Sequence, residues 1–345
     1  CAPATGGVSR LSPEDSRLTG TAASQASRPD GAVDTAAPRR AAAGSTPEAR
    51  PDLKARMARV MAAMRAKSAL EDARWDDAQH AAVRDLLESL PRDAPGALAL
   101  CLEGPQRTPG HSARDRYRHP LETLAFFGLR RDMVVMDLGP GGGWYTELLA
   151  PVLGGRGTLR LVGYAPDSIT PMKATAGQHL LHFLSRSEAL YGTVTPVHND
   201  PPEQLSLGPD ASVDLVLAFR EMHNWVRGGY LDAYLAAVHA VLKEGGILGV
   251  VQHRAAPGSD PITSAERGYL PEAWVIQHAQ RAGFALDGRE EINSNPRDTR
   301  DYPRGVWALP PSLTHGDQDR QRYLDIGESD RMTLRFRKQD SAPPN

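Results

Sequence analysis

The stretch VVMDLGPGGGWYTELLA, residues 134–150, decides the fold of this 345-residue chain. A short apolar run ends in an acidic residue, four glycines follow within five positions, and a helical pattern begins directly afterwards. A buried strand that turns sharply into a helix is the repeating unit of parallel sheets. Glycine lacks a side chain and tolerates positive φ, so a ligand can approach the backbone of such a turn. We therefore predict a ligand-binding loop at the carboxyl end of a strand.

Fixed positions in this stretch distinguish three kinds of glycine loop. A phosphate-binding P-loop ends in GK[ST], which does not follow these glycines. A dinucleotide-binding loop requires a glycine at position 144, where this chain has tryptophan. The pattern acid-x-Gly-x-Gly-x-Gly does fit, with Asp137, Gly139, Gly141 and Gly143 in register. A plain turn needs only one glycine, so four of them favour a bound molecule.

The sequence around the loop alternates between strand-like and helix-like patterns from about residue 121 onward. Strands are predicted over 133–139 and 157–165, within 187–200, and over 212–219, 245–253 and 331–338. Helices are predicted over 121–129, 144–153, 230–242 and 271–283. Such alternation predicts an α/β fold, in which helices cover both faces of a parallel sheet.

The N-terminal part of the chain has a different composition. Residues 1–50 are rich in Ala, Ser, Thr, Pro, Gly and Arg, contain no aromatic residue, and are predicted to be a disordered tether. Helices are predicted over 52–72 and over 76–90, the second capped by Asp76 or Asp77. The chain is thus expected to continue with a helical extension over 51–110, a folded domain over 111–338 and a disordered tail over 339–345.

Charge, apolar runs and cysteine content argue against several classes of protein. The formal net charge is -2, which gives no reason to expect a nucleic-acid partner. No apolar run approaches the roughly 18 residues that a membrane-spanning helix requires. Two cysteines can form neither a disulfide framework nor a cysteine-based zinc site, and we predict no metal site.

Cys1 bears on the location of the protein, because the chain begins with cysteine and not with methionine. A cysteine followed by a long polar stretch resembles the first mature residue of a processed bacterial lipoprotein. We therefore expect a lipid on Cys1 and an exported protein, anchored to the cell envelope on its periplasmic side. The alternative is an arbitrary boundary of the sequence and a cytoplasmic protein.

The acid-and-glycine pattern resembles motif I of the class I S-adenosylmethionine-dependent methyltransferases, and the LKEGG turn at 242–246 is similar to their LKPGG turn. Residues 111–338 further resemble a bacterial, often exported, family of predicted methyltransferases. The segments that carry this resemblance are YRHPLETLAFFGLRRDMVVMDLGPGGGWYTELLAPVL, DLVLAFREMHNWV, VLKEGGILGVVQHRA, NPRDTRDYPRGVWALPP and GESDRMTLRFRK. The resemblance implies a Rossmann-like, doubly wound seven-stranded sheet with six parallel strands and a final antiparallel one. It also implies S-adenosyl-L-methionine as the cofactor.

The same resemblance assigns cofactor-binding roles to the loop residues Asp137, Gly139, Pro140, Gly141, Gly142 and Gly143. Class I enzymes usually end the second strand with an acid that holds the ribose hydroxyls, but Gly163 or Tyr164 stands there in this chain. Asp167, slightly later, is the remaining candidate for the ribose. Asp200, after the third strand, is the candidate for the adenine amino group, although an ordinary turn residue is equally expected before two prolines.

Candidate catalytic residues follow the fourth predicted strand, whose end lies beside the glycine loop in this fold. The candidates are Arg220, Glu221, His223, Asn224 and Trp225, and the catalytic roles are assigned to Glu221, His223 and Asn224. Histidine can take a proton from the acceptor near neutral pH, although a hydrogen-bonded structural histidine is the alternative. Weaker candidates are Tyr117, Arg118, His119, His253, Arg254, Ser329, Asp330 and Arg331.

These residues predict methyl transfer from S-adenosylmethionine to an unknown acceptor, either a small molecule or a component of the cell envelope. The alternative is an exported, non-catalytic ligand-binding module that keeps the methyltransferase fold. Two observations favour that alternative. Export through Cys1 conflicts with a cofactor made in the cytoplasm, and the acid expected at the end of the second strand is missing.

Overall fold

The computed structural model describes residues 62, 66, 68–201 and 205–339. The predicted tether, with Cys1, lies outside the described residues, so lipid attachment and export stay predictions. Most of the helix predicted over 52–72 also lies outside them, but residues 68–74 are helical. Within the described part of the chain, no helix is long and apolar enough to cross a membrane.

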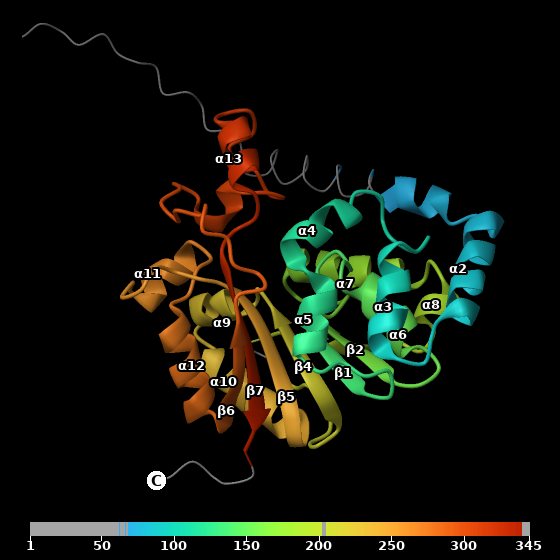
Figure 1. Cartoon of the computed structure of the whole chain (residues 1–345), viewed down its shortest axis with the longest axis horizontal. Coiled ribbons are helices and arrows are strands. Elements are labelled where there is room, and N and C mark those ends of the chain that lie inside the picture. The colour runs from blue at the N-terminus through green and yellow to red at the C-terminus, as the bar shows by residue number, and fades with distance from the viewer. Residues whose placement is uncertain (1–61, 63–65, 67, 202–204, 340–345) are drawn as a thin grey trace, which may run out of the picture. The chain divides into compact units, whose positions relative to one another are not determined.

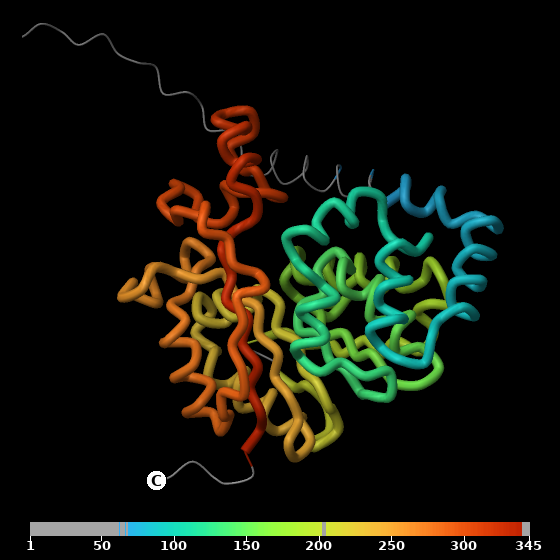
Figure 2. Tube along the Cα trace, viewed as in Figure 1, coloured from blue at the N-terminus to red at the C-terminus, as the bar shows by residue number. Residues whose placement is uncertain are grey.

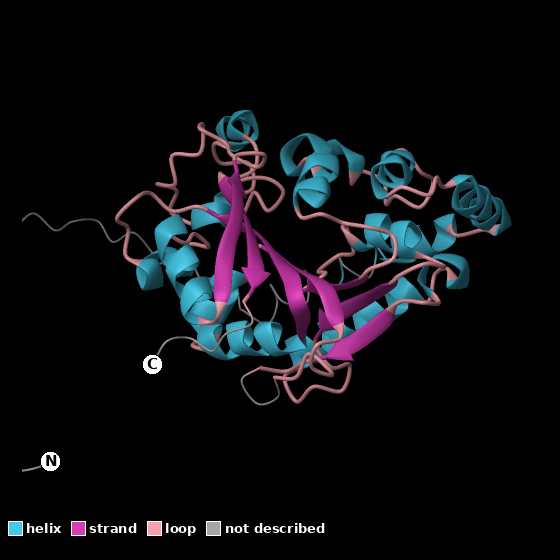
Figure 3. Ribbon diagram, turned by 60° about the horizontal axis from the view of Figure 1, so that its bottom comes forward, coloured by secondary structure: helices cyan, strands magenta, loops and turns pink. Residues whose placement is uncertain are grey.

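Seven strands form one sheet in the order β3-β2-β1-β4-β5-β7-β6, shown in magenta in Figure 3. The strands are β1 (Val134–Leu138), β2 (Thr158–Gly163), β3 (Thr195–His198), β4 (Val213–Phe219), β5 (Leu242–His253), β6 (Phe284–Glu290) and β7 (Arg331–Lys338). The pairs from β3 to β5 are parallel, and β7 runs antiparallel to both β5 and β6. This order confirms the predicted Rossmann-like sheet of the class I methyltransferase fold.

Helices cover both faces of the sheet (Figure 1). One layer holds α3 (Ala94–Leu102), α5 (Pro120–Phe126), α6 (Thr146–Leu153), α7 (Pro171–Leu184) and α8 (Glu188–Tyr191), and the other holds α9 (Met222–Gly228), α10 (Leu231–Val241), α11 (Pro261–Glu266) and α12 (Glu272–Arg281). Successive strand residues point to opposite faces, so Val135 packs in the first core and Met136 in the second. Because both faces are buried, the inner strands read as continuous apolar runs.

Helix α2 (Asp77–Ser89) follows the predicted helix over 76–90 closely. Asp76 is its N-cap and accepts a hydrogen bond from the Gln79 backbone N–H at 2.8 Å. Val83 of α2 and Leu98 of α3 belong to the same core as Val135 of β1. The helices of the N-terminal extension therefore pack into the first layer, while the domain boundaries themselves stay predictions.

Several elements were not predicted from the sequence, and β6 and α9 show the reason. Strand β6 has a single buried residue, Phe284, so it lacks the apolar pattern that marks the inner strands. Helix α9 has only seven residues, too few to show a helical period. Both follow from tertiary packing, because β6 pairs along β7 and α9 packs into the second core.

The segment between β6 and β7, residues 291–330, stands beyond the ends of these strands, as the orange and red tube in Figure 2 shows. It includes α13 (Arg320–Ile326) and has a small core of its own, built from Tyr302, Ala308, Leu309 and Tyr323. We call it the cap segment.

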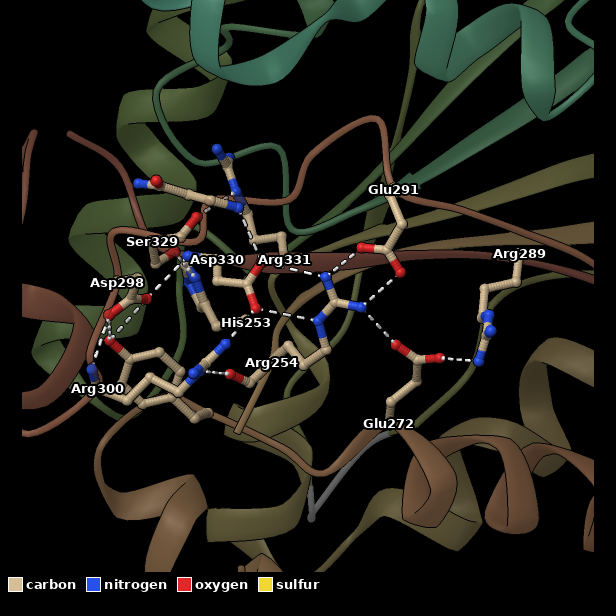
Figure 4. Close-up of polar contacts among 12 residues, drawn as sticks. His253, Arg254, Glu272, Arg289, Glu291, Asp298, Arg300, Ser329, Asp330 and Arg331 are labelled. Atoms are coloured by element: carbon tan, nitrogen blue, oxygen red, sulfur yellow. Dashed lines mark hydrogen bonds and ion pairs between the residues drawn. The ribbon is translucent and has the colours of Figure 1, made fainter. Parts of the chain in front are cut away.

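Asp330 ties the cap segment to the sheet (Figure 4). Its carboxylate accepts hydrogen bonds from Arg254 Nε at 3.0 Å and from Arg300 Nη2 at 2.6 Å. Arg254 directly follows β5, and its guanidinium also pairs with Glu272 and Glu291. These pairs fix the cap segment against the end of β5.

Candidate functional site

The glycine loop after β1 presents two different surfaces. A Cβ on Gly139 would meet the Glu221 side chain at 2.7 Å, and one on Gly143 would meet the Phe183 ring at 2.6 Å. By contrast, a Cβ on Gly141, whose φ is +56°, would find no atom within 4 Å. Gly142 is equally open. The outer glycines are thus needed for packing, whereas the middle ones leave open space that a ligand can occupy.

Among the described residues, three cavities border this loop; one of about 390 Å³ contacts it at Gly141 and Gly142, and the other two are both lined by Gly139, Pro140, Gly141, Glu221 and Asn224. The first of these two, of about 310 Å³, reaches toward the ends of β2 and β3, and we call it the β2 cavity. The second, of about 640 Å³, reaches toward the end of β5 and the cap segment, and we call it the β5 cavity. Their other lining includes Tyr164, Asn199 and Tyr230 in the β2 cavity and Arg118, His253 and Ser329 in the β5 cavity.

The structure brings most of the predicted site residues to these cavities. Asp137, Gly142 and His223 line the β5 cavity, in addition to the residues that both cavities share. Gly143 lines neither cavity and packs on the Phe183 ring. The binding and catalytic roles of all these residues remain predictions.

The two acids predicted for the nucleoside end are not part of the lining. Neither Asp167 nor Asp200 is among the residues that line the β2 cavity, so their assigned roles stay predictions that this geometry does not support. Asn199, next to Asp200, does line it, and its side-chain amide donates to the Tyr234 hydroxyl at 2.7 Å. The sequence offered no signal for Asn199 beyond its place at the end of β3.

Asp137 and Glu221 are the carboxyl groups that face the loop. Burial raises the pKa of Asp137 to about 7, although Arg220 and Arg118 oppose the shift. Burial likewise raises the pKa of Glu221 to about 7, against a hydrogen bond from Asn224 at 3.1 Å. Asp137 Oδ1 is buried and has no hydrogen-bond partner among the described residues. Both groups are thus poised to ionise when a cation enters.

Two neutral histidines line the β5 cavity, with ring centroids 5.7 Å apart. Burial lowers the pKa of His223 to about 4 and holds that of His253 well below its ordinary value. Gln252 Nε2 donates to the Gly268 carbonyl at 3.0 Å and also lies 3.4 Å from His223 Nδ1, so His223 Nδ1 accepts and its other nitrogen carries the proton.

His253 is free to adopt the opposite tautomer. Its Nδ1 lies 2.5 Å from Ser329 Oγ, a hydroxyl that can accept as well as donate. When Nδ1–H donates to Ser329, the other ring nitrogen is left as a proton acceptor. The hydrogen bonds therefore leave the acceptor nitrogen at Nε2 in His253 and at Nδ1 in His223, and a catalytic role for either histidine stays a prediction.

Glu147 holds the segment that precedes α4 (Asp115–Arg118) against the loop. This fully buried residue of α6 accepts from the Thr108 backbone N–H at 3.1 Å and lies 3.0 Å from His111 Nδ1. Trp144 Nε1 donates to the His111 carbonyl at 2.9 Å. Arg118 is thereby placed on the β5 cavity, while its neighbours Tyr117 and His119 line neither cavity.

No protein-family model and no curated protein sequence matches this chain. Among solved structures, it is similar to a SAM-dependent methyltransferase from Aquifex aeolicus, with 15% identity over 66% of this chain and 93% of that one and a TM-score of 0.43. It is similar to the [4+2]-cyclase SpnF, with 18% identity over 65% of this chain and 81% of that one and a TM-score of 0.44. A third similar structure is an S-adenosylmethionine-dependent methyltransferase from Mesorhizobium loti, with 14% identity over 63% of this chain and 97% of that one and a TM-score of 0.39. The fold assignment rests on the strand order.

Proposed function

We propose that the protein binds S-adenosylmethionine across the two cavities and transfers its methyl group to an acceptor in the β5 cavity. The observation that carries this proposal is the open face of Gly141, which lines both cavities at once. A cofactor with a nucleoside at one end and an amino acid at the other needs such a bare backbone between two compartments.

The residues present fit the two ends of that cofactor. Tyr164, Asn199 and Tyr230 give the β2 cavity the aromatic and amide groups that suit a nucleoside. Asp137 and Glu221 supply carboxylates for the cationic groups of the methionine end. The unpartnered, buried Oδ1 of Asp137 is the group whose burial is hardest to explain without a cationic ligand.

When bound, the cofactor supplies a methyl group on a positively charged sulfur. Loss of this methyl group to the nucleophilic atom of the acceptor would leave the sulfur as a neutral thioether that keeps the electron pair of the broken bond. The protein's part is to hold acceptor and methyl group in line and to exclude water. His253 takes the proton of the acceptor where its nucleophilic atom carries one.

The test is direct titration of the full chain with S-adenosylmethionine and S-adenosylhomocysteine in a calorimeter. We expect saturable binding at one site. Absence of binding by the intact protein would overturn the proposal. Transfer of a labelled methyl group to extracts of small molecules and of cell envelope then separates an enzyme from a non-catalytic binding module with the same fold.

We expect the affinity for S-adenosylmethionine to rise by about tenfold between pH 5.5 and 7. The cofactor's cations favour the ionised forms of Asp137 and Glu221, whose pKa values near 7 leave both mostly protonated at pH 5.5. His223, with a pKa of about 4, stays neutral over this range. Calorimetry at several pH values measures the slope.

The control for this pH dependence is Asp137→Asn, which removes one of the two titrating carboxyls. Its affinity should be lower at pH 7 and should change less with pH than that of the wild type. An equal slope in the variant would show that Asp137 does not ionise on binding.

A further inference from the structure

Three arginines surround the Glu328 carboxylate beside the β5 cavity. The Glu328 carboxylate accepts hydrogen bonds from Arg114 Nε at 2.6 Å and from Arg331 Nη1 at 3.2 Å. Arg118 Nε lies 4.0 Å from the same carboxylate. Burial alone would raise the pKa of Glu328, but Arg331, Arg114 and Arg118 hold it at about 2. Glu328 is therefore fully ionised, in contrast to Asp137 and Glu221 of the same cavity, whose pKa values are raised to about 7.

Arg118 is a buried arginine whose guanidinium donors lack hydrogen-bond acceptors among the described residues. It is only 3% exposed, and its Nε and Nη1 have no hydrogen-bond partner within the described part of the chain. Its guanidinium lies 4.4 Å from the centroid of the Trp144 ring. Stacking on an aromatic ring offsets only part of the cost of burying a charge, and arginine stays protonated in proteins. The donors of Arg118 thus lack an acceptor at the wall of a cavity.

Arg220 adds a second unpaired guanidinium to the same wall. It directly follows β4 with φ +62°, a left-handed conformation that is uncommon for residues other than glycine. Its backbone N–H donates to the Val251 carbonyl at 2.7 Å, which fixes this conformation. Among the described residues, its side chain has neither a hydrogen bond nor an ion pair, although burial lowers its pKa. The left-handed backbone of Arg220 therefore places its guanidinium group at the wall of the β5 cavity.

A second group of arginines, near the cap segment, offers a comparison because its guanidinium groups are paired with carboxylates. Arg254, Arg289 and Arg300 are each bonded to carboxylates, with Glu272, Glu291 and Asp330 as their partners (Figure 4). In that network acids and bases are balanced. At the β5 cavity, where Arg114, Arg118 and Arg220 are part of the lining, Arg118 and Arg220 make no side-chain hydrogen bond to a carboxylate among the described residues.

We propose that the methyl acceptor carries a carboxylate or phosphate group, which Arg118, Arg220 and Arg114 bind in the β5 cavity. This inference rests on the proposed function. The two cationic groups of the cofactor are met by Asp137 and Glu221 in the proposed function, which leaves Glu328 as the remaining carboxylate of the cavity beside Arg114, Arg118 and Arg220. An anionic acceptor gives these arginines a further anion and the forked geometry that guanidinium groups prefer. Acceptor and cofactor should therefore strengthen each other's binding.

The test titrates the full chain with sodium phosphate and, separately, with sodium acetate, at an ionic strength kept constant with sodium chloride. Trp144 and Trp307 line the β5 cavity, so tryptophan fluorescence reports binding of either anion without any cofactor. Calorimetry then measures the affinity for S-adenosylmethionine with each anion present. We expect at least one of them to raise that affinity by about tenfold. The anion that does so identifies the preferred group of the acceptor.

The variants Arg220→Gln and Arg114→Gln should lose both the fluorescence change and the gain in affinity, while Arg84→Gln, at an exposed position of α2, should keep both. Arg114 is partly exposed, so its variant tests the inference even where the other does not fold. Unchanged responses in both variants, or no response of the wild type to either anion, would overturn the inference.

A separate experiment tests whether the arginines bind the anionic group of the acceptor or the carboxylate of the cofactor itself. An analogue of S-adenosylmethionine that lacks the carboxylate should still gain affinity from the anion. If only the cofactor's own carboxylate used the arginines, the variants would weaken S-adenosylmethionine but not the analogue, and added anions would have no effect. Failure of the wild type to bind any cofactor while fluorescence still reports phosphate would reject the proposed function and leave the anion site standing.

Discussion

Gly141→Val should lower the affinity for S-adenosylmethionine by at least about a hundredfold, the largest effect on binding that we expect from a single change. Gly141 lines both cavities, and an added side chain would stand in open space and not against protein atoms. The valine would therefore occupy the volume that the proposed cofactor needs. Calorimetric titration of the variant measures the loss.

Gly155→Val is the matched control. Gly155 also has a positive φ, +71°, and also leaves open space around an added Cβ, but it lies in the exposed turn between α6 and β2. Either valine should cost about 1–2 kcal/mol of stability through the left-handed backbone alone. Equal cofactor binding by the two variants would show that the open face of Gly141 has no ligand role.

The glycine loop was predictable because its information is local. Asp137 and the alternating glycines lie within seven residues, and β1 and α6 on either side are buried enough to give clear apolar patterns. Strand β6 was not predictable, since its place at the edge of the sheet depends on pairing with β7 far along the chain. The number of strands and the antiparallel direction of the last one came from the resemblance and could not be derived from spacing alone.

The candidate site was predictable only for residues that directly follow a parallel strand, because ligands bind at the carboxyl ends of such strands. Glu221 and His223 follow β4, so the topology places them beside the loop before any coordinates are known. The rule finds Arg220, which directly follows β4, but it cannot group it with Arg114, Arg118 and Arg331, because the fold alone brings these four residues together.

The missing acid at the end of β2 has a physical explanation in α7. A Cβ on Gly163 would lie 2.8 Å from Leu180 Cδ2, so the close approach of this helix leaves little room for a side chain. Position 163 therefore cannot take the usual acid unless the Leu180 side chain moves aside. Any contact to a ribose must come from other residues of the β2 cavity, such as Tyr164 or Asn199.

Asp330→Ala should give the largest loss of stability, about 2–4 kcal/mol at pH 7. The side chain of Asp330 is only 4% exposed and accepts hydrogen bonds from Arg254, from Arg300 and from the Asn295 backbone N–H. Removing it leaves Arg300 without its carboxylate partner and frees the cap segment from β5. We place the estimate below that for a fully buried pair because both arginines are partly exposed.

Chemical denaturation of Asp330→Ala beside Asp287→Ala checks this expectation. Asp287 also pairs with two arginines, Arg335 and Arg337, but it is 27% exposed at the edge of the sheet, and its loss should cost only about 0–1 kcal/mol. Similar losses in the two variants would show that the cap segment does not depend on Asp330.

The stabilisation by Asp330 should also depend on pH. Burial alone would raise the pKa of Asp330, but hydrogen bonds from Arg254, Asn295 and Arg300 hold it below the ordinary value of 3.8. A carboxyl with a lowered pKa stabilises the folded state above its unfolded pKa and loses that contribution as the pH falls through the folded value. The difference between wild type and Asp330→Ala should therefore be full at pH 7 and should shrink below about pH 4. A difference that stays constant down to acidic pH would show that packing, and not the charge of Asp330, holds the cap segment over the β5 cavity.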